Sequence, residues 1–253
     1  EYGGDGLTTG WADLGLGFRN GAAAQFLARE FDRMFSVAER PQHWFARLRR
    51  GQRPPAHEPV PGVQVLLSGP GRSPSAFQAA LRRDLHAARE VALVSAYFLP
   101  TFRQRKLLRE AARRGGCVRI IVPGKSDVAL SRNAARHLYA PLLRAGVEIY
   151  EYEPQILHAK LMVVDGAAYV GSSNLDTRSL HINHEVMLRL TDPAAVNGAR
   201  EIFERLVSRS RRVEPAVWRR SRTWLEKARC AVSFWLLARV DPYVTRWLLQ
   251  QPR

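Results

Sequence analysis

The amino-acid sequence predicts an α/β protein in which helices cover both faces of a mostly parallel, mixed β-sheet. Apolar segments of strand length alternate with amphipathic helical segments between residues 63 and 174. Glycines and prolines separate these segments, as is typical of boundaries between elements. The chain has 253 residues, of which 46% are hydrophobic, so it can bury a sizeable core. This order of elements is typical of a layered sheet.

The elements are assigned in chain order from their apolar patterns. On the helix expected at 74–90, Phe77, Leu81 and Leu85 share one apolar face. Pro141 is expected to kink or shorten the helix at 129–145. The other expected elements are a helix at 102–114, strands at 63–67, 91–97, 118–122 and 147–152, and a hairpin of strands at 157–164 and 169–174.

An internal repeat indicates how the chain is organised. Asp13 aligns with Glu185, an offset of 172 residues, and both copies continue as a strand and an amphipathic helix without a gap. By this offset the partner of His158 would precede Glu1. The expected segments are the end of a first half-domain (1–46), an Arg- and Pro-rich linker (47–61), a second half-domain (62–209) and a basic, Trp-rich tail (210–253).

The charge and the cysteines limit the classes of function. The net charge of +16 favours a polyanionic partner, either nucleic acid or a membrane rich in anionic lipid. The two cysteines, Cys117 and Cys230, show neither metal-ligand nor disulfide-framework spacing, which is compatible with a reducing compartment. No group of His, Cys and Asp residues has convincing metal spacing. We therefore expect no metal and no cofactor.

One stretch combines groups that suit phosphate chemistry, and it occurs once in the chain. Residues i and i+2 of a strand share a face, so His158 and Lys160 should point the same way. A three-residue hairpin loop at 165–167 would pair Lys160 with Ser172 and His158 with Asn174. The candidate catalytic residues are His158, Lys160, Asp165, Ser172, Asn174 and Glu185.

A phosphodiester fits this cluster. Lys160 offers a positive charge to a non-bridging oxygen, and His158 can attack phosphorus or protonate a leaving oxygen. A carboxylate should hold the other ring nitrogen of His158, and Glu185 on the next strand is the candidate. Asp165 lies at the expected turn and is interpreted as more structural than chemical. Each fragment alone would be typical of a surface loop, but their order between apolar strands favours a site.

These residues carry a resemblance to a known family. Residues 157–166 and 171–174 resemble the HxK(x4)D and GSxN motif of the phospholipase D superfamily. Five residues rather than the usual six separate Asp165 from Gly171. The segments 97–100, 124–127, 145–152 and 174–185 resemble the bacterial cardiolipin synthase branch, and 1–4 and 11–13 resemble the region after the first motif of that family. The chain is therefore expected to start after a first motif.

The resemblance implies a phospholipase D-like fold and a two-step transfer through a phosphohistidine, without a metal. Each half-domain would supply one histidine. His158 would then protonate the leaving alcohol and later activate the incoming one. Lys160 and Asn174, supported by Ser172, would bind the phosphoryl oxygens. Asp13 would be left over from the absent half, either orienting the missing histidine or forming a polar strand end.

Five further residues are candidates for binding substrate. Tyr97 and Phe98 follow a predicted parallel strand, and sites of α/β proteins open at such strand ends. A buried aromatic strand end is the alternative for both. Ser126 and Asp127 follow the next strand, and Ser173 belongs to the Gly-Ser-Ser-Asn turn.

The tail combines tryptophans with arginines. On a helix, Trp224, Ala228, Ala231, Trp235 and Ala238 would form one stripe. The apolar run at 231–238 is too short to span a bilayer, which needs about 20 residues. It suits a helix lying in the membrane interface. The alternative is a helix packed on the domain with a solvated basic face.

The leading interpretation is a phosphatidyltransferase that acts on anionic phospholipids such as phosphatidylglycerol. It would be peripheral, at the cytoplasmic face of the bacterial membrane. A nuclease or phosphodiesterase of the same superfamily, acting as a homodimer, is the second interpretation, although the tail disfavours nucleic acid as the partner. A catalytically incomplete membrane-binding module is the third.

Overall fold

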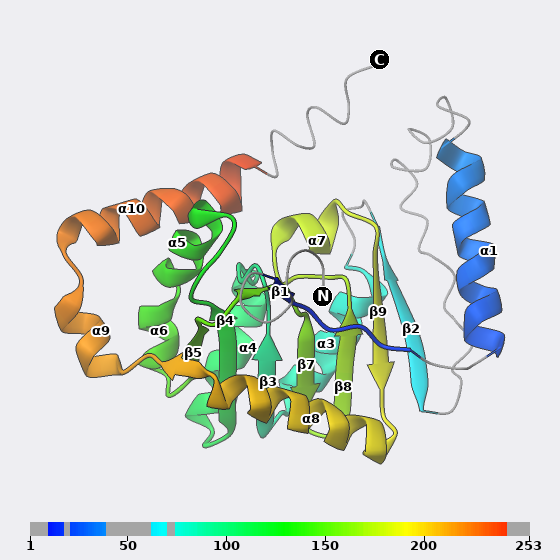
Figure 1. Ribbon diagram of the computed structural model, residues 1–253, viewed down its shortest axis with the longest axis horizontal. Helices are drawn as coiled ribbons and strands as arrows, with labels where there is room; N and C mark the ends of the chain where they lie inside the picture. Colours follow the sequence, from blue (N-terminus) through cyan, green and yellow to red (C-terminus); the bar gives the residue numbers. More distant parts are fainter. Residues whose placement is uncertain (1–9, 18–20, 39–61, 70–73, 242–253) are drawn as a thin grey trace.

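A computed structural model describes residues 10–17, 21–38, 62–69 and 74–241 of the chain (Figure 1). Within them, eight strands form one sheet in the order β10-β5-β4-β3-β7-β8-β9-β2. The predicted α/β class with helices on both faces is confirmed. The strands are β2 (Val63–Ser68), β3 (Glu90–Val94), β4 (Cys117–Pro123), β5 (Glu148–Tyr152), β7 (Leu161–Val164), β8 (Ala167–Gly171), β9 (Glu185–Leu190) and β10 (Ser210–Arg212).

Two apolar clusters lie on opposite faces of the sheet, because neighbouring strand residues point to opposite sides. In β3, Leu93 joins one cluster, whereas Ala92 and Val94 join the other. In Figure 1, α8 crosses in front of the sheet, while α3 and α4 lie behind it. The helices of the first cluster are α3 (Ala76–His86), α4 (Phe102–Arg113), α5 (Ala129–His137) and α6 (Tyr139–Leu143), and those of the second are α1 (Gly21–Ala38) and α8 (Pro193–Ser208).

The sheet is mixed, but the expectation that it is mostly parallel needs correction. Among the described strands, only β3 with β4 and β4 with β5 form parallel pairs within it. Its other neighbours pair antiparallel. A short loop explains one of these pairs, β7 with β8, because a two-residue turn can join only antiparallel neighbours.

The predicted hairpin is present as β7 and β8, but its predicted register is wrong by one residue. Leu161 lies opposite Val170, and Val164 lies opposite Ala167. The turn therefore has two residues, Asp165 and Gly166, rather than three. Asp165 adopts a positive φ of 47°, which a short polar side chain tolerates.

A second, two-stranded sheet joins the N-terminal segment to the rest of the chain. Strand β1 (Trp11–Ala12) pairs in parallel with β6 (Ile156–Leu157). Helix α1 begins at Gly21 and α8 at Pro193, which keeps the offset of the predicted repeat. The strand expected from Asp13 onwards does not form in residues 13–17. The assignment of 1–46 to a first half-domain stays a prediction, and the linker at 47–61 lies outside the described residues.

The tail begins within the main sheet. Strand β10 pairs with β5, so the sheet continues past the boundary expected at residue 209. Helices α9 (Pro215–Ser221) and α10 (Trp224–Trp235) follow, and the π-helix η1 (Leu236–Val240) extends α10. Helix α10 packs on α5 (Figure 1). In the part of the chain that the structure describes, no helix is long and apolar enough to cross a bilayer.

Candidate active site

Strand β1 brings a carboxylate to the imidazole of His158. The carbonyl of Ala12 accepts hydrogen bonds from the backbone amides of His158 (2.8 Å) and Ala159 (3.0 Å). This pairing places Asp13 beside His158, with 2.8 Å between Oδ2 and Nδ1. The indole of Trp11 packs against the imidazole, at 4.7 Å between ring centroids. The site is therefore built by two segments that are remote in sequence.

Lys160 is the buried cation of the site. Its Nζ lies 2.9 Å from both ring nitrogens of His158, and the residue is 6% exposed. Burial lowers the pKa of Lys160, because the charged form loses its hydration. Nearby carboxylates act in the opposite direction; they belong to Asp13, Glu185, Asp127 and Asp176.

The contact with Asp13 orients the imidazole of His158. A carboxylate only accepts hydrogen bonds, so Nδ1 carries the proton that is shared with Asp13. Lys160 lies equally far from both ring nitrogens and does not distinguish between them. Nε2 is then the nitrogen that faces a reacting group.

Glu185 does not contact His158, so the prediction that it orients this imidazole is wrong. The hydroxyl of Ser172 donates to Glu185, with 2.5 Å between Oγ and Oε2. The amide nitrogen of Asn183 donates to the other carboxylate oxygen at 3.3 Å. Glu185 stands at the start of β9, which pairs antiparallel with β8, so its carboxylate meets the residue that follows β8.

A hydrogen-bonded chain joins the ends of β3, β4 and β8. The side-chain oxygen of Asn174 accepts from the backbone amide of Tyr97 at 3.2 Å, which leaves the amide nitrogen of Asn174 to donate to a ligand. The hydroxyl of Tyr97 donates to Asp127 at 3.0 Å. Burial, and then Asp127, raise the pKa of Tyr97 to about 12. Ser126 donates to the carbonyl of Val128 at 3.2 Å. Tyr97, Ser126 and Asp127 thus gather as predicted, and their contact with substrate stays a prediction.

Three predicted site residues serve the fold instead. Asp165 lies at the far end of β7, where its carboxylate accepts from the amides of Glu90 (2.8 Å) and Arg89 (3.1 Å). The prediction that Asp165 is a catalytic residue was therefore wrong, whereas its interpretation as a structural residue agrees with these contacts. Phe98 and Ser173 are only 1% and 0% exposed. The prediction that these two side chains bind substrate is therefore wrong, because they point into the core while their neighbours Tyr97 and Ser172 do not.

Sequence reasoning missed Trp11 and misjudged Asp13. The alignment of Asp13 with Glu185 in the repeat could have marked Asp13 as a site residue, because Glu185 is a carboxylate close to the motif. The signal could not tell which imidazole Asp13 faces, because the pairing of β1 with β6 is a long-range contact. Asp176 was also missed. It caps α7 (Thr177–His181) by accepting from the amide of Ser179 at 2.8 Å, and burial raises its pKa.

The arrangement can hold and protonate a phosphodiester. The ammonium of Lys160 and the amide of Asn174 provide donors for non-bridging oxygens. The imidazole of His158, held at Nδ1, presents Nε2 for proton transfer or for attack on phosphorus.

Comparisons with known proteins agree with this chemistry. The family model described as "Cardiolipin synthase, PLD-like domain" matches residues 81–207, half of the chain. Cardiolipin synthase A of Yersinia pseudotuberculosis serotype O:3 (strain YPIII) is 35% identical over 164 residues, which cover 64% of this chain and 34% of that protein. Cardiolipin synthase A of Cronobacter sakazakii (strain ATCC BAA-894) is 36% identical over the same shares. The chain spans about a third of the length of these curated relatives.

Two solved structures share the fold. The phospholipase D family member Nuc from Salmonella typhimurium aligns with a TM-score of 0.50 at 20% identity, over 60% of this chain and 97% of Nuc. Phosphatidylserine synthase of Haemophilus influenzae Rd KW20 aligns with a TM-score of 0.55 at 14% identity, over 72% of this chain and 46% of the synthase. At these identities the likeness concerns the fold alone. With the family match over half of its length, this chain belongs to the phospholipase D superfamily, in the cardiolipin synthase branch.

Proposed function

We propose that the site transfers a phosphatidyl group from one anionic phospholipid to a hydroxyl of another, as a cardiolipin synthase-like phosphatidyltransferase. The observation that carries the proposal is the contact set of Asp13, His158 and Lys160. It combines an oriented imidazole with a buried ammonium, and both suit an anionic phosphodiester. With phosphatidylglycerol as donor and acceptor, the products are cardiolipin and glycerol.

The transfer takes two steps. In the first, a second imidazole attacks phosphorus, a P–N bond forms and the P–O bond to glycerol breaks. His158 enters this step protonated on both ring nitrogens and gives its Nε2 proton to the leaving oxygen, while Asp13 stabilises the charged ring before the transfer. In the second, the acceptor hydroxyl returns a proton to Nε2 of His158 and its oxygen attacks phosphorus. The P–N bond then breaks. Lys160 and Asn174 hold the non-bridging oxygens throughout.

The repeat indicates where the second imidazole binds. Asp13 holds His158, and Glu185 aligns with Asp13 in the repeat. Glu185, which accepts from Ser172 at 2.5 Å, would therefore hold the second imidazole. Another half-domain of a longer chain or a second copy in a homodimer would supply that group.

The tail supports a lipid substrate at a membrane surface. Helix α10 presents exposed Trp224 and Trp235. Helix η1 is followed by Asp241, which pairs with Arg178 of α7 at 3.1 Å. Together with the net charge of +16, this supports peripheral binding at an anionic membrane, which we place at the cytoplasmic face.

The experiment is a transfer assay on vesicles that contain phosphatidylglycerol. The 253-residue chain is assayed beside a version with any upstream coding sequence restored, and cardiolipin and glycerol are measured by mass spectrometry. The active version should lose turnover when His158 becomes Ala, and the matched His86→Ala variant, an exposed histidine of α3, should keep it. A donor with a p-nitrophenol leaving group needs no general acid, so it should restore the first step in His158→Ala. Full turnover by His158→Ala, or cleavage of DNA in place of lipid transfer, would refute the proposal.

A further inference from the structure

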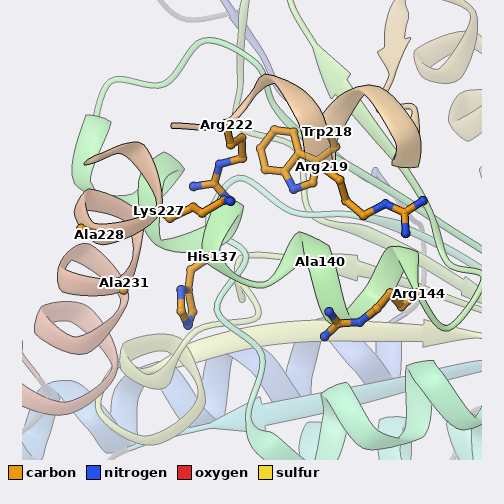
Figure 2. Close-up of a pocket in the computed structure, with 9 residues that line it drawn as sticks. All are labelled: His137, Ala140, Arg144, Trp218, Arg219, Arg222, Lys227, Ala228 and Ala231. Atoms are coloured by element: carbon orange, nitrogen blue, oxygen red, sulfur yellow. The ribbon is translucent and has the colours of Figure 1, made fainter. Parts of the chain in front are cut away.

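A pocket lined by cationic and apolar side chains lies away from the candidate active site. Its volume is about 560 Å³, and it opens between helices α5 and α6 on one side and α9 and α10 on the other (Figure 2). It shares no residue with the site around His158. The lining residues are His137, Ala140, Arg144, Trp218, Arg219, Arg222, Lys227, Ala228 and Ala231.

The pocket concentrates positive charge. Four of its residues are cationic: Arg144, Arg219, Arg222 and Lys227. Among the described residues, none of these four lies within salt-bridge distance of a carboxylate. By contrast, the nearby Arg136 and Arg211 both bind Glu151. Gathering like charges raises the free energy of the folded state, and a bound anion relieves this cost.

The wall of the pocket is held in place by stacking and hydrogen bonds. The guanidinium carbon of Arg222 lies 4.7 Å from the ring centroid of Trp218. Arg222 also donates to the carbonyl of Glu226 at 3.2 Å. Trp218 in turn packs on the buried ring of Tyr139, at 4.8 Å between centroids. Arg222 is therefore positioned before any ligand binds, which limits the entropy lost on binding.

The pocket adjoins an exposed apolar surface of the same helix. On α10, Trp224 is 74% exposed and Trp235 is 57% exposed, while Cys230 and Ser233 face the protein and are buried. Ala228 and Ala231 line the pocket and share the helical face of these two tryptophans. Figure 2 shows Lys227 and Arg222 extending into the space between α10 and the helix that carries Trp218. A cationic pocket that borders an apolar helix face matches an amphipathic anion.

We propose that this pocket binds the phosphate of an anionic phospholipid at a membrane surface, with the acyl chains beside the apolar face of α10. It is a second lipid site, separate from the catalytic one. A phospholipid is the expected occupant because its phosphate complements the cations and its acyl chains can cover the apolar face of α10. A free phosphate or a nucleic acid would leave that apolar face exposed to water. The proposal rests on the membrane association proposed above and does not depend on turnover.

The test compares two pairs of substitutions that remove the same charge. The double variant Arg144→Gln/Lys227→Gln removes two exposed cations from the pocket and keeps Arg222, which stacks on Trp218. Arg82→Gln with Arg205→Gln removes two exposed cations of α3 and α8. Binding of the 253-residue chain is measured by co-sedimentation with phosphatidylcholine vesicles, with and without phosphatidylglycerol. We expect the pocket pair to weaken binding to phosphatidylglycerol vesicles about 30-fold, because each of the two basic residues near an anionic surface contributes about 1 kcal/mol. The control pair, which lies away from the pocket, should weaken binding several-fold less.

The possible results separate this proposal from its competitors. If both pairs of substitutions weakened vesicle binding equally, the attraction would come from the whole charged surface, and the proposal of a specific lipid site would be wrong. Inorganic phosphate and duplex DNA are then added as competitors. If either one displaces the protein from vesicles only when the pocket is intact, and binds the protein as tightly as the vesicles do, the pocket does not select a lipid. Arg144→Lys should bind like the unmodified chain. Because the readout is vesicle binding and not turnover, a failure of catalysis and a failure of this site are distinguishable.

Discussion

The carboxylate of Asp13 lies 2.8 Å from Nδ1 of His158, although 145 residues separate the two in the chain. The contact depends on Ala12, whose carbonyl binds the backbone amide of His158. Both side chains are only partly exposed, 30% for Asp13 and 29% for His158. Asp13 is therefore a positioning residue, which acts on the substrate through the imidazole.

Replacing Asp13 with Asn should lower kcat by about 10²–10⁴-fold and leave KM nearly unchanged, because the ring loses its fixed tautomer and the stabilisation of its charged form. Steady-state assays on phosphatidylglycerol vesicles give both constants. Nitrogen NMR of the chain gives the tautomer directly, and the signal of protonated Nδ1 should weaken in the variant. Asp32→Asn on the exposed surface of α1 is the matched control. A variant with normal kcat and an unchanged tautomer would show that another group orients His158.

The pH dependence of turnover should report Lys160. Burial lowers its pKa from the ordinary value of 10.5, so the native protein loses this proton before the unfolded chain does. Turnover should fall at a pH below 10.5, because a neutral amine no longer attracts the phosphate. Tyr97 cannot cause this fall, since its pKa is about 12.

The free energy of unfolding should change in the opposite direction over the same range. Between the native pKa of Lys160 and 10.5, the unfolded state binds more protons than the native state, so stability rises with pH there. Urea titrations at several pH values measure this rise, and Lys160→Met should abolish it. Turnover and stability that fall together would instead indicate general alkaline unfolding.

The sequence was sufficient where local pattern decides the structure. Alternating apolar segments indicated the strands and helices between residues 63 and 174, and Asp165-Gly166 indicated a hairpin. The order of His158 and Lys160 indicated phosphate chemistry. In each instance, residues close in the chain carry the signal.

The sequence was insufficient where remote contacts or single-residue shifts decide. The positive φ of Asp165 shortens the turn by one residue, and such a shift changes which side chains lie opposite one another. Asp13 reaches His158 through a pairing of two-residue strands, which has too few residues to leave a pattern. Phe98 and Ser173 adjoin site residues in sequence, but their side chains point to the other side.

Substitutions of Asp165 can show whether this motif residue stabilises the fold or takes part in catalysis. Asp165→Ala should destabilise the protein by about 2–4 kcal/mol, because it frees two backbone amides and strains a positive φ. Asp165→Asn should cost less than about 1 kcal/mol, since it keeps an acceptor oxygen and tolerates this conformation. Urea unfolding measures both values. The folded fraction of each variant should turn over normally, and a selective loss of kcat in Asp165→Asn would return this residue to the chemistry.

Glu151 anchors the helices that carry the cationic pocket. The residue is fully buried, and its carboxylate accepts from Arg136 of α5 at 2.9 and 3.0 Å and from the hydroxyl of Tyr139 at 3.1 Å. Arg211 of β10 binds the same carboxylate. One acidic group therefore ties β5 to three elements, α5, α6 and β10.

Replacing Glu151 with Gln should lower the free energy of unfolding by about 2–4 kcal/mol, because Arg136 stays largely buried without its counter-charge. Glu153→Gln is the matched control: its carboxylate also pairs with Arg211, but it is 48% exposed, so its loss should cost less than about 1 kcal/mol. Urea unfolding of the two variants, at equal m-values, measures the difference. Since α10 packs on α5, Glu151→Gln should also loosen the pocket and weaken vesicle binding before it affects Asp13 and His158. Equal costs for the two substitutions would show that the network is solvated and that α5 is held by apolar packing alone.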